Sequence, residues 1–137
     1  MKKIFSFFLV LTAFVIMSCS DNATGPSTGG LGGGGTTGGS VTFTVSLAQD
    51  QQQQYYFEFK PSTAVVINTI TANCPAANIN NEQVTDNGTT VYDANNAAYV
   101  GPITVLAQGQ QWTFTIAGKL GSSTGTAYSV SANYTVQ

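Results

Sequence analysis

Residues 41–137 are predicted to form one all-β domain, a single antiparallel β-sandwich of about seven or eight short strands. Apolar and polar residues alternate in most of its segments, which is the pattern of a half-buried strand. Turn-forming residues separate these segments at short intervals. No segment has the apolar spacing of a helix face. Together these observations favour two packed antiparallel sheets.

The strands are expected where the alternation is clearest. They cover residues 41–47, 55–60, 64–71, 83–92 (as a hairpin), 103–105, 112–116 and 128–136. In residues 55–60, Phe57 and Phe59 are expected in the core and Tyr56 on the outer face. Residues 64–71 alternate less strictly, which favours a more fully buried strand. Trp112 is in phase with Phe114 and is therefore expected in the core as well.

The hairpin prediction rests on Asn87 and Gly88. Both residues tolerate positive φ, so the pair fits a two-residue type I′ turn. This turn would set Val84 opposite Val91, where the two side chains can pack across the strands.

The same register predicts a candidate calcium site formed by Glu82, Asp86 and Asp93, with Asn95 and Asn96 just beyond them. Calcium takes six to eight oxygen ligands from carboxylates, amides and carbonyls. A cation would also relieve the repulsion between Glu82 and Asp93, which the register places opposite each other. The alternative is that pairing stops before Glu82 and that the three carboxylates are simply solvated.

The N-terminal segment has the order of a secretory signal. Lys2 and Lys3 precede an uncharged, mostly apolar stretch of 14 residues, Ile4 to Met17. As a helix this stretch would span about 21 Å, short of the ~30 Å hydrocarbon core of a bilayer. A cleaved signal is therefore favoured over a transmembrane helix.

The residues Ile16-Met17-Ser18-Cys19 at the end of this segment resemble the lipobox of bacterial lipoproteins. The resemblance implies that the Cys19 thiol receives a diacylglyceryl group, that cleavage removes residues 1–18, and that the new amine is acylated. Ser20 after the cysteine implies an outer-membrane destination. The alternatives are a plain signal peptide with an incidental Cys19, or an uncleaved anchor.

Residues 19–40 are expected to be a lipidated cysteine followed by a flexible linker. Between Gly25 and Gly39, nine of fifteen residues are glycine, so the segment has almost nothing to bury. The domain that follows, residues 41–137, resembles immunoglobulin-like and fibronectin-like sandwiches in its number and spacing of strands. It lacks the Cys…Trp…Cys pattern of antibody-type domains.

The composition excludes several kinds of chemistry. The chain has no His and no Arg, which removes Ser-His-Asp and Cys-His arrangements, histidine zinc sites and arginine clamps on phosphate. After residue 18, Lys60 and Lys119 stand against six Asp and Glu residues, a side-chain charge of −4. Nucleic acid is therefore not an expected partner, and the domain is not expected to be an enzyme. Cys74 is expected to be an inert, buried or semi-buried thiol.

The sequence thus predicts a lipid-anchored protein of the bacterial cell envelope, held at the outer membrane through Cys19. Its sandwich would serve an interaction or structural role toward an envelope protein or a glycan. The alternative is a carbohydrate-binding accessory module, possibly calcium-dependent. In that case Tyr56 is the exposed aromatic side chain expected to contact the sugar.

Overall fold

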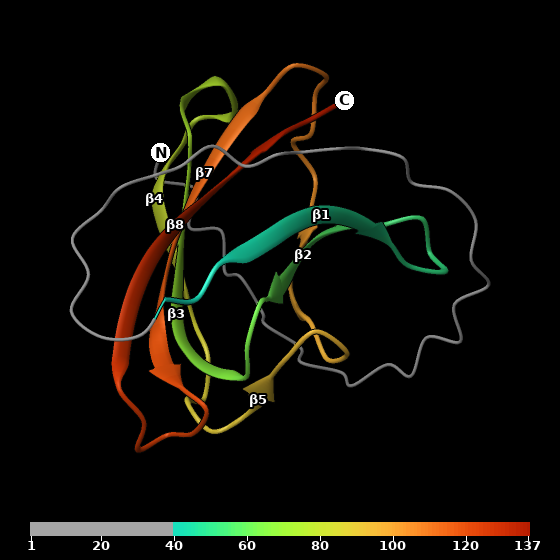
Figure 1. Cartoon of the computed structure of the whole chain (residues 1–137). Helices are drawn as coiled ribbons and strands as arrows, with labels where there is room; N and C mark the ends of the chain where they lie inside the picture. The colour runs from blue at the N-terminus through green and yellow to red at the C-terminus, as the bar shows by residue number, and fades with distance from the viewer. Residues whose placement is uncertain (1–39) are drawn as a thin grey trace.

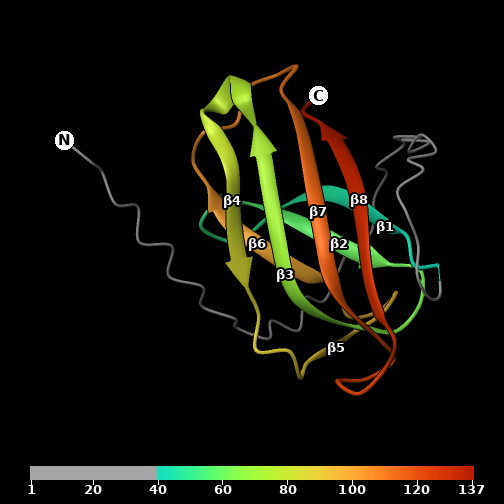
Figure 2. The ribbon, with the colours of Figure 1, turned by 90° about the vertical axis from the view of Figure 1, so that its left-hand side faces the viewer.

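The computed structural model describes residues 40–137, which form two antiparallel β-sheets and contain no α-helix (Figure 1). The elements are β1 (Phe43–Gln49), β2 (Tyr55–Pro61), β3 (Val65–Cys74), a short 3-10 turn (Pro75–Ala77), β4 (Ile79–Thr85), β5 (Val91–Tyr92), β6 (Ala98–Ile103), β7 (Gln111–Leu120) and β8 (Ala127–Thr135). The smaller sheet has the order β1-β2-β6, and the larger has the order β4-β3-β7-β8, with β5 also paired to β3. Figure 2 shows the larger sheet in front, with the smaller sheet crossing behind it. The all-β prediction is confirmed.

The core lies between the two sheets and is centred on aromatic side chains. The ring centroid of Phe57 lies 4.9 Å from that of Trp112 and 4.8 Å from that of Phe114. Phe59 meets Phe114 edge-on at 4.9 Å. These distances are those of favourable tilted and edge-to-face pairs. The four side chains are at most 3% exposed, so their predicted core positions are confirmed.

β3 is the most deeply buried strand, as its sequence predicted. It pairs with β7 on one side and with β4 and β5 on the other. Val65, Val66 and Ile67 are consecutive and each is at most 1% exposed. This continuous burial explains why the segment alternates so weakly.

The predicted Asn87–Gly88 hairpin is wrong. β4 and β5 do not pair with each other; Val84 is opposite Ile70 and Val91 is opposite Val66, both on β3. Gly88 has a φ of 70°, but Asn87 is not among the residues with positive φ, so a type I′ turn does not form. Instead, the Asn87 Oδ1 accepts hydrogen bonds from the backbone N–H groups of the two following threonines at 2.8 and 3.1 Å. The turn therefore steps along one edge of β3 and does not reverse the chain.

The strand predicted at residues 103–105 lies earlier in the chain, at Ala98–Ile103. Val105 falls outside the strand and is 43% exposed. Gly101 and Pro102 suggest a turn in the sequence, but β6 is an edge strand, where proline is tolerated. Tyr55, the first residue of β2, is 43% exposed, although alternation places it on the same face of the strand as Phe57.

The described part of the chain enters the sandwich at one corner. Phe43, at the start of β1, lies beside Tyr128 of β8 with ring centroids 6.0 Å apart. The β1–β2 loop lies at the opposite end of β1 (Figure 1). The predicted signal, residues 1–18, and all but the last residue of the predicted linker, residues 19–40, lie outside the described residues.

Candidate functional site

A connected row of polar side chains crosses the outer face of the smaller sheet. Because Phe57 and Phe59 point inward, Glu58 between them points outward. Glu58 is opposite Ser46 of β1 and opposite Tyr99 of β6. Its Oε2 accepts a hydrogen bond from the Ser46 hydroxyl at 2.7 Å, and its Oε1 accepts one from the Tyr99 hydroxyl at 3.0 Å. The carboxylate of the central strand thus ties together side chains from all three strands.

Tyr56 lies next to this row and is held at two places. A Cβ added to Gly101 would come within 2.7 Å of the Tyr56 Cδ1, so the ring lies close against the β6 backbone at a glycine. The Tyr56 hydroxyl donates to the Asp50 Oδ2 at 3.1 Å. The other oxygen of Asp50 accepts the backbone N–H groups of Gln52 and Gln54, each at 2.9 Å. Asp50 therefore shapes the β1–β2 loop and orients the tyrosine.

We call this surface the tyrosine face; it consists of Ser46, Asp50, Tyr56, Glu58 and Tyr99. Burial, and then the hydrogen bond to Glu58, raise the pKa of Tyr99 to about 12. Burial and the bond to Asp50 also raise the pKa of Tyr56. Both phenols are therefore protonated at neutral pH and act as hydrogen-bond donors to the carboxylates.

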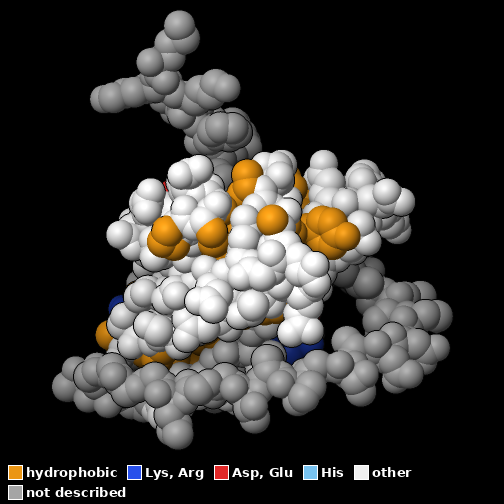
Figure 3. Space-filling model, turned by 90° about the horizontal axis from the view of Figure 1, so that it is seen from above, with side chains coloured by type: hydrophobic (Ala, Val, Ile, Leu, Met, Phe, Trp, Pro, Cys, Tyr) orange, Lys and Arg blue, Asp and Glu red, His pale blue; other side chains and the backbone are white. Residues whose placement is uncertain are grey.

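The tyrosine face holds two of the five acidic side chains of residues 40–137, Asp50 and Glu58. In the view of Figure 3 most of the described surface is uncharged, and the apolar side chains form separate small patches. Lys60 lies beside the face, with its Nζ 3.7 Å from the Glu58 Oε1. At this distance, and with the lysine side chain 47% exposed, the pair contributes little to stability.

The three residues of the predicted calcium site have separate surroundings. Glu82 is exposed on β4, opposite Ala72 of β3. The Asp86 carboxylate accepts a hydrogen bond from the Tyr92 hydroxyl, and the Asp93 carboxylate caps a turn by accepting backbone N–H groups. Within residues 40–137 no group of three acidic, cysteine or histidine side chains could hold a metal ion. The predicted site depended on the register of the Asn87–Gly88 hairpin, which does not form.

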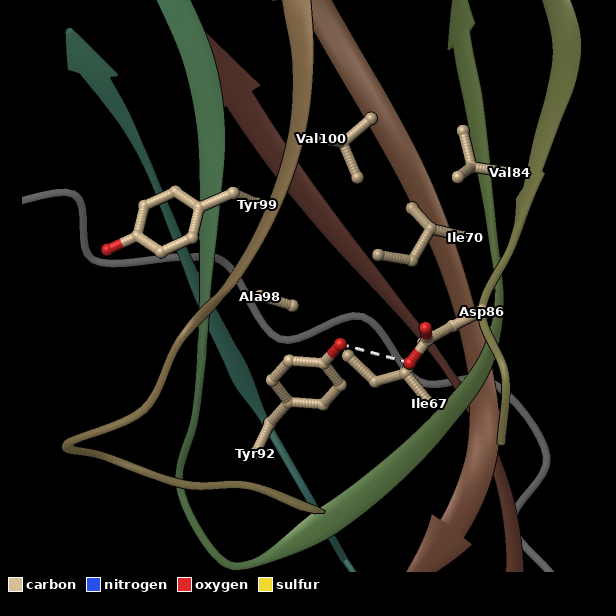
Figure 4. A pocket seen from close by; sticks show the side chains of 8 residues that line it. All are labelled: Ile67, Ile70, Val84, Asp86, Tyr92, Ala98, Tyr99 and Val100. Carbon is tan, nitrogen blue, oxygen red and sulfur yellow. Dashed lines mark hydrogen bonds between the residues drawn. The ribbon is translucent and has the colours of Figure 1, made fainter. Parts of the chain in front are cut away.

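A pocket lies at the open side of the sandwich, between β3, β4 and β6 (Figure 4). It is lined by Ile67, Ile70, Val84, Asp86, Tyr92, Ala98, Tyr99 and Val100. Figure 4 shows the Tyr92 hydroxyl directed at Asp86, whereas the ring of Tyr99 points away from the pocket. The cavity volume is about 20 Å³, room for about one water molecule, so the pocket does not accommodate an organic ligand.

Replacing Tyr92 with phenylalanine is expected to destabilise the domain by about 1–2 kcal/mol, because the part-buried Asp86 loses a donor at 3.0 Å. Burial and the bond to Asp86 raise the pKa of Tyr92 above its usual value of 10.0. A raised pKa in the folded state stabilises the fold below pH 10, and this contribution is lost as the pH rises above it. Urea denaturation at pH 7 and pH 11 should therefore show a smaller difference between the variant and the native protein at pH 11. An equal difference at both pH values would contradict this account.

Cys74, at the end of β3, is 0% exposed, as expected for a buried thiol. Cys19 lies outside the described residues, and the structure does not test its predicted role. Among residues 40–137 there is no helix with the length and apolar character needed to cross a membrane.

The sequence singled out Tyr56 as a ligand contact but did not single out the other four members of the tyrosine face. Tyr99 lies between Ala98 and Val100, which are both buried. Strand alternation could therefore have predicted that the Tyr99 side chain points outward. Its partner Glu58 lies 41 positions away, and no local pattern indicates that β6 pairs with β2. Comparisons with protein-family models, with curated proteins and with solved structures found no match to this chain.

Proposed function

We propose that this chain is a lipid-anchored protein of the bacterial cell envelope, and that its sandwich is a non-catalytic interaction or structural module. The observation that carries the proposal is the sequence Ile16-Met17-Ser18-Cys19 at the end of a 14-residue apolar segment. Two or three acyl chains on one cysteine would hold the protein in the membrane almost permanently, since each CH₂ buried in the bilayer contributes about 0.8 kcal/mol to membrane binding.

The segment between the anchor and the folded part supports the same proposal. It is rich in glycine up to Gly39, and the first strand begins at Phe43. A chain of about 21 flexible residues has a typical end-to-end distance of roughly 25 Å. The linker would let the sandwich sample a shell of that depth above the membrane, and this confinement raises its effective concentration toward neighbouring envelope components.

We also infer that the sandwich is of the immunoglobulin-like kind. The order β1-β2-β6 matches strands A-B-E of such domains, and β3-β7-β8, with β4 and β5 at the edge of β3, matches C-F-G with an additional edge strand. The domain departs from antibody domains because its buried tryptophan is on β7 and its cysteine on β3.

The charge distribution supports a neutral partner over a nucleic acid. After residue 18 the side-chain charge is −4, with Lys60 and Lys119 as the basic groups. A nucleic-acid backbone requires a positively charged surface. Ser20 after the cysteine favours an outer-membrane location by resemblance to enteric lipoproteins.

Replacing Cys19 with alanine is expected to move the protein from the membrane fraction to the soluble fraction, or to leave its signal uncleaved. The reason is that alanine has no thiol to accept the lipid. Fractionation of cells expressing the native chain and Cys19→Ala, followed by detergent phase partitioning, makes the comparison. Cys74→Ala is the matched control, and it should remain in the membrane fraction. Membrane association of Cys19→Ala equal to that of the native chain, with a cleaved signal, would refute the anchor.

A further inference from the structure

We propose that the tyrosine face binds a neutral glycan chain, with Tyr56 and Tyr99 stacking on sugar rings and Glu58 and Asp50 accepting hydrogen bonds from sugar hydroxyls. This inference rests on the proposed function, in which the sandwich is an interaction module. It assigns a ligand class to that module and a set of residues to the contact.

The two tyrosines are held in place before any ligand arrives. Tyr99 is 37% exposed, and its hydroxyl reaches across from β6 to Glu58 on β2 at 3.0 Å. Tyr56 is backed by the β6 backbone at Gly101, and its hydroxyl is bonded to Asp50 at 3.1 Å. Side chains fixed in this way lose little rotamer freedom on binding, which is the usual advantage of rigid tyrosines in binding surfaces.

The polar groups of the face suit hydroxyl donors. Glu58 and Asp50 are carboxylates, and each oxygen has more than one acceptor position. The Glu58 oxygens each accept one bond within the protein, from Ser46 and Tyr99. Acceptor positions therefore remain for hydroxyl groups of a ligand lying across the sheet. Gln54, whose Oε1 lies 3.3 Å from the Tyr56 hydroxyl, adds an amide at the same end.

The carboxylates of the tyrosine face disfavour an anionic glycan and so favour a neutral one. The face carries two carboxylates, and Lys60 beside them already lies 3.7 Å from Glu58. Uronate, sialate or sulfate groups would be placed next to these carboxylates, and like charges at an interface are unfavourable. The face also has no exposed aliphatic side chain among its five members, whereas protein interfaces usually have an apolar centre.

The position of the face in the molecule agrees with this use. The described chain enters at Phe43, and Asp50 directly follows the other end of β1. A strand of seven residues is about 23 Å long, so Asp50 and Tyr56 lie well away from the point where the linker arrives. Figure 1 shows β1 running from beside β8 out to the β1–β2 loop. A ligand chain could approach this end without meeting the linker's entry point.

The test uses the labelled full chain, solubilised in a nonionic detergent, on an array of neutral oligosaccharides together with uronate-containing, sialylated and sulfated ones. Binding is expected among the neutral oligosaccharides, and titration of the best one should show that Tyr56→Ala and Tyr99→Ala each weaken it by about tenfold or more. Tyr99→Phe keeps the ring and should retain more binding than Tyr99→Ala. Tyr55→Ala is the matched control, because strand alternation sends this exposed tyrosine toward the opposite face of β2, and its affinity should stay within about twofold.

Three results would overturn the glycan assignment: no binding to any neutral oligosaccharide, equal or tighter binding to anionic ones, or an equal loss of affinity in Tyr55→Ala. Thermal denaturation of each variant establishes that it is folded before binding is compared. Because the protein is solubilised, the array does not depend on the anchor. If no neutral glycan binds but the chain is lipid-modified and membrane-bound, only the glycan assignment is wrong. Failure of the anchor itself would appear in the Cys19 fractionation and in the mass of the mature chain, not on the array.

Discussion

Replacing Phe57 with alanine is expected to destabilise the domain by about 3–5 kcal/mol. Phe57 is 1% exposed and joins the two sheets, because its ring contacts Trp112 and Phe114 on β7 and, at 5.8 Å, Tyr134 on β8. Removing it leaves a cavity between sheets that cannot close fully around the rigid rings, so both burial and aromatic contacts are lost. Since domains of this size are stable by about 5–15 kcal/mol, the loss is a large share of the total.

Thermal and urea denaturation of the variant measure this effect. A domain of this length is expected to lose about 4–8 °C in Tm for each kcal/mol. Phe57→Leu is the matched control, because it fills much of the volume and should cost about 1.5 kcal/mol or less if the core repacks. A loss below about 1 kcal/mol for Phe57→Ala would show that Phe57 does not join the sheets as described.

Replacing Gly118 with alanine is expected to cost about 3 kcal/mol or more, or to prevent folding. A Cβ at this position would lie 2.0 Å from the Val66 carbonyl oxygen and 2.9 Å from the Tyr128 hydroxyl. The two groups are themselves joined, since the Tyr128 hydroxyl donates to the Val66 carbonyl at 3.3 Å. The new methyl group would therefore separate β3 from β7 and break a buried hydrogen bond.

Gly109→Ala provides the comparison for Gly118→Ala. Gly109 has a φ of 85° but no atom within 4 Å of an added Cβ, so alanine there meets backbone strain alone, at about 1–2 kcal/mol. The soluble yield and Tm of the two variants distinguish the steric clash expected at Gly118 from the backbone strain expected at Gly109. If Gly118→Ala were as stable as Gly109→Ala, the close approach of β3 to β7 would be wrong.

Alternation was sufficient to locate most strands and to assign their inner faces. Phe57, Phe59 and Trp112 were predicted in the core, and Tyr56 outside it, because successive side chains in a strand point to opposite faces. β6 was placed too late, since Ala98 is a weak apolar signal and Gly101-Pro102 suggests a turn. An edge strand tolerates these residues, but the sequence does not indicate which strands lie at an edge.

The failures share a physical cause, which is that pairing between distant segments overrides local turn preference. Asn87-Gly88 is a strong local signal for a hairpin, but the exposed edge of β3 offers partners to both Val84 and Val91. The calcium prediction depended on the register of this hairpin. Likewise, the tyrosine face depends on Glu58 of β2 lying between Ser46 of β1 and Tyr99 of β6. The residues of β1 and β6 do not by themselves indicate that both strands pair with β2.

The central claim, attachment of the domain to a membrane through Cys19, is tested most directly by the intact mass of the mature protein purified from its native membrane. The account predicts a chain that has lost residues 1–18 and carries acyl chains at a new N-terminal Cys19. Fragmentation should place the added mass on that first residue. A mature chain with no lipid mass, or one that still carries residues 1–18, would contradict the account.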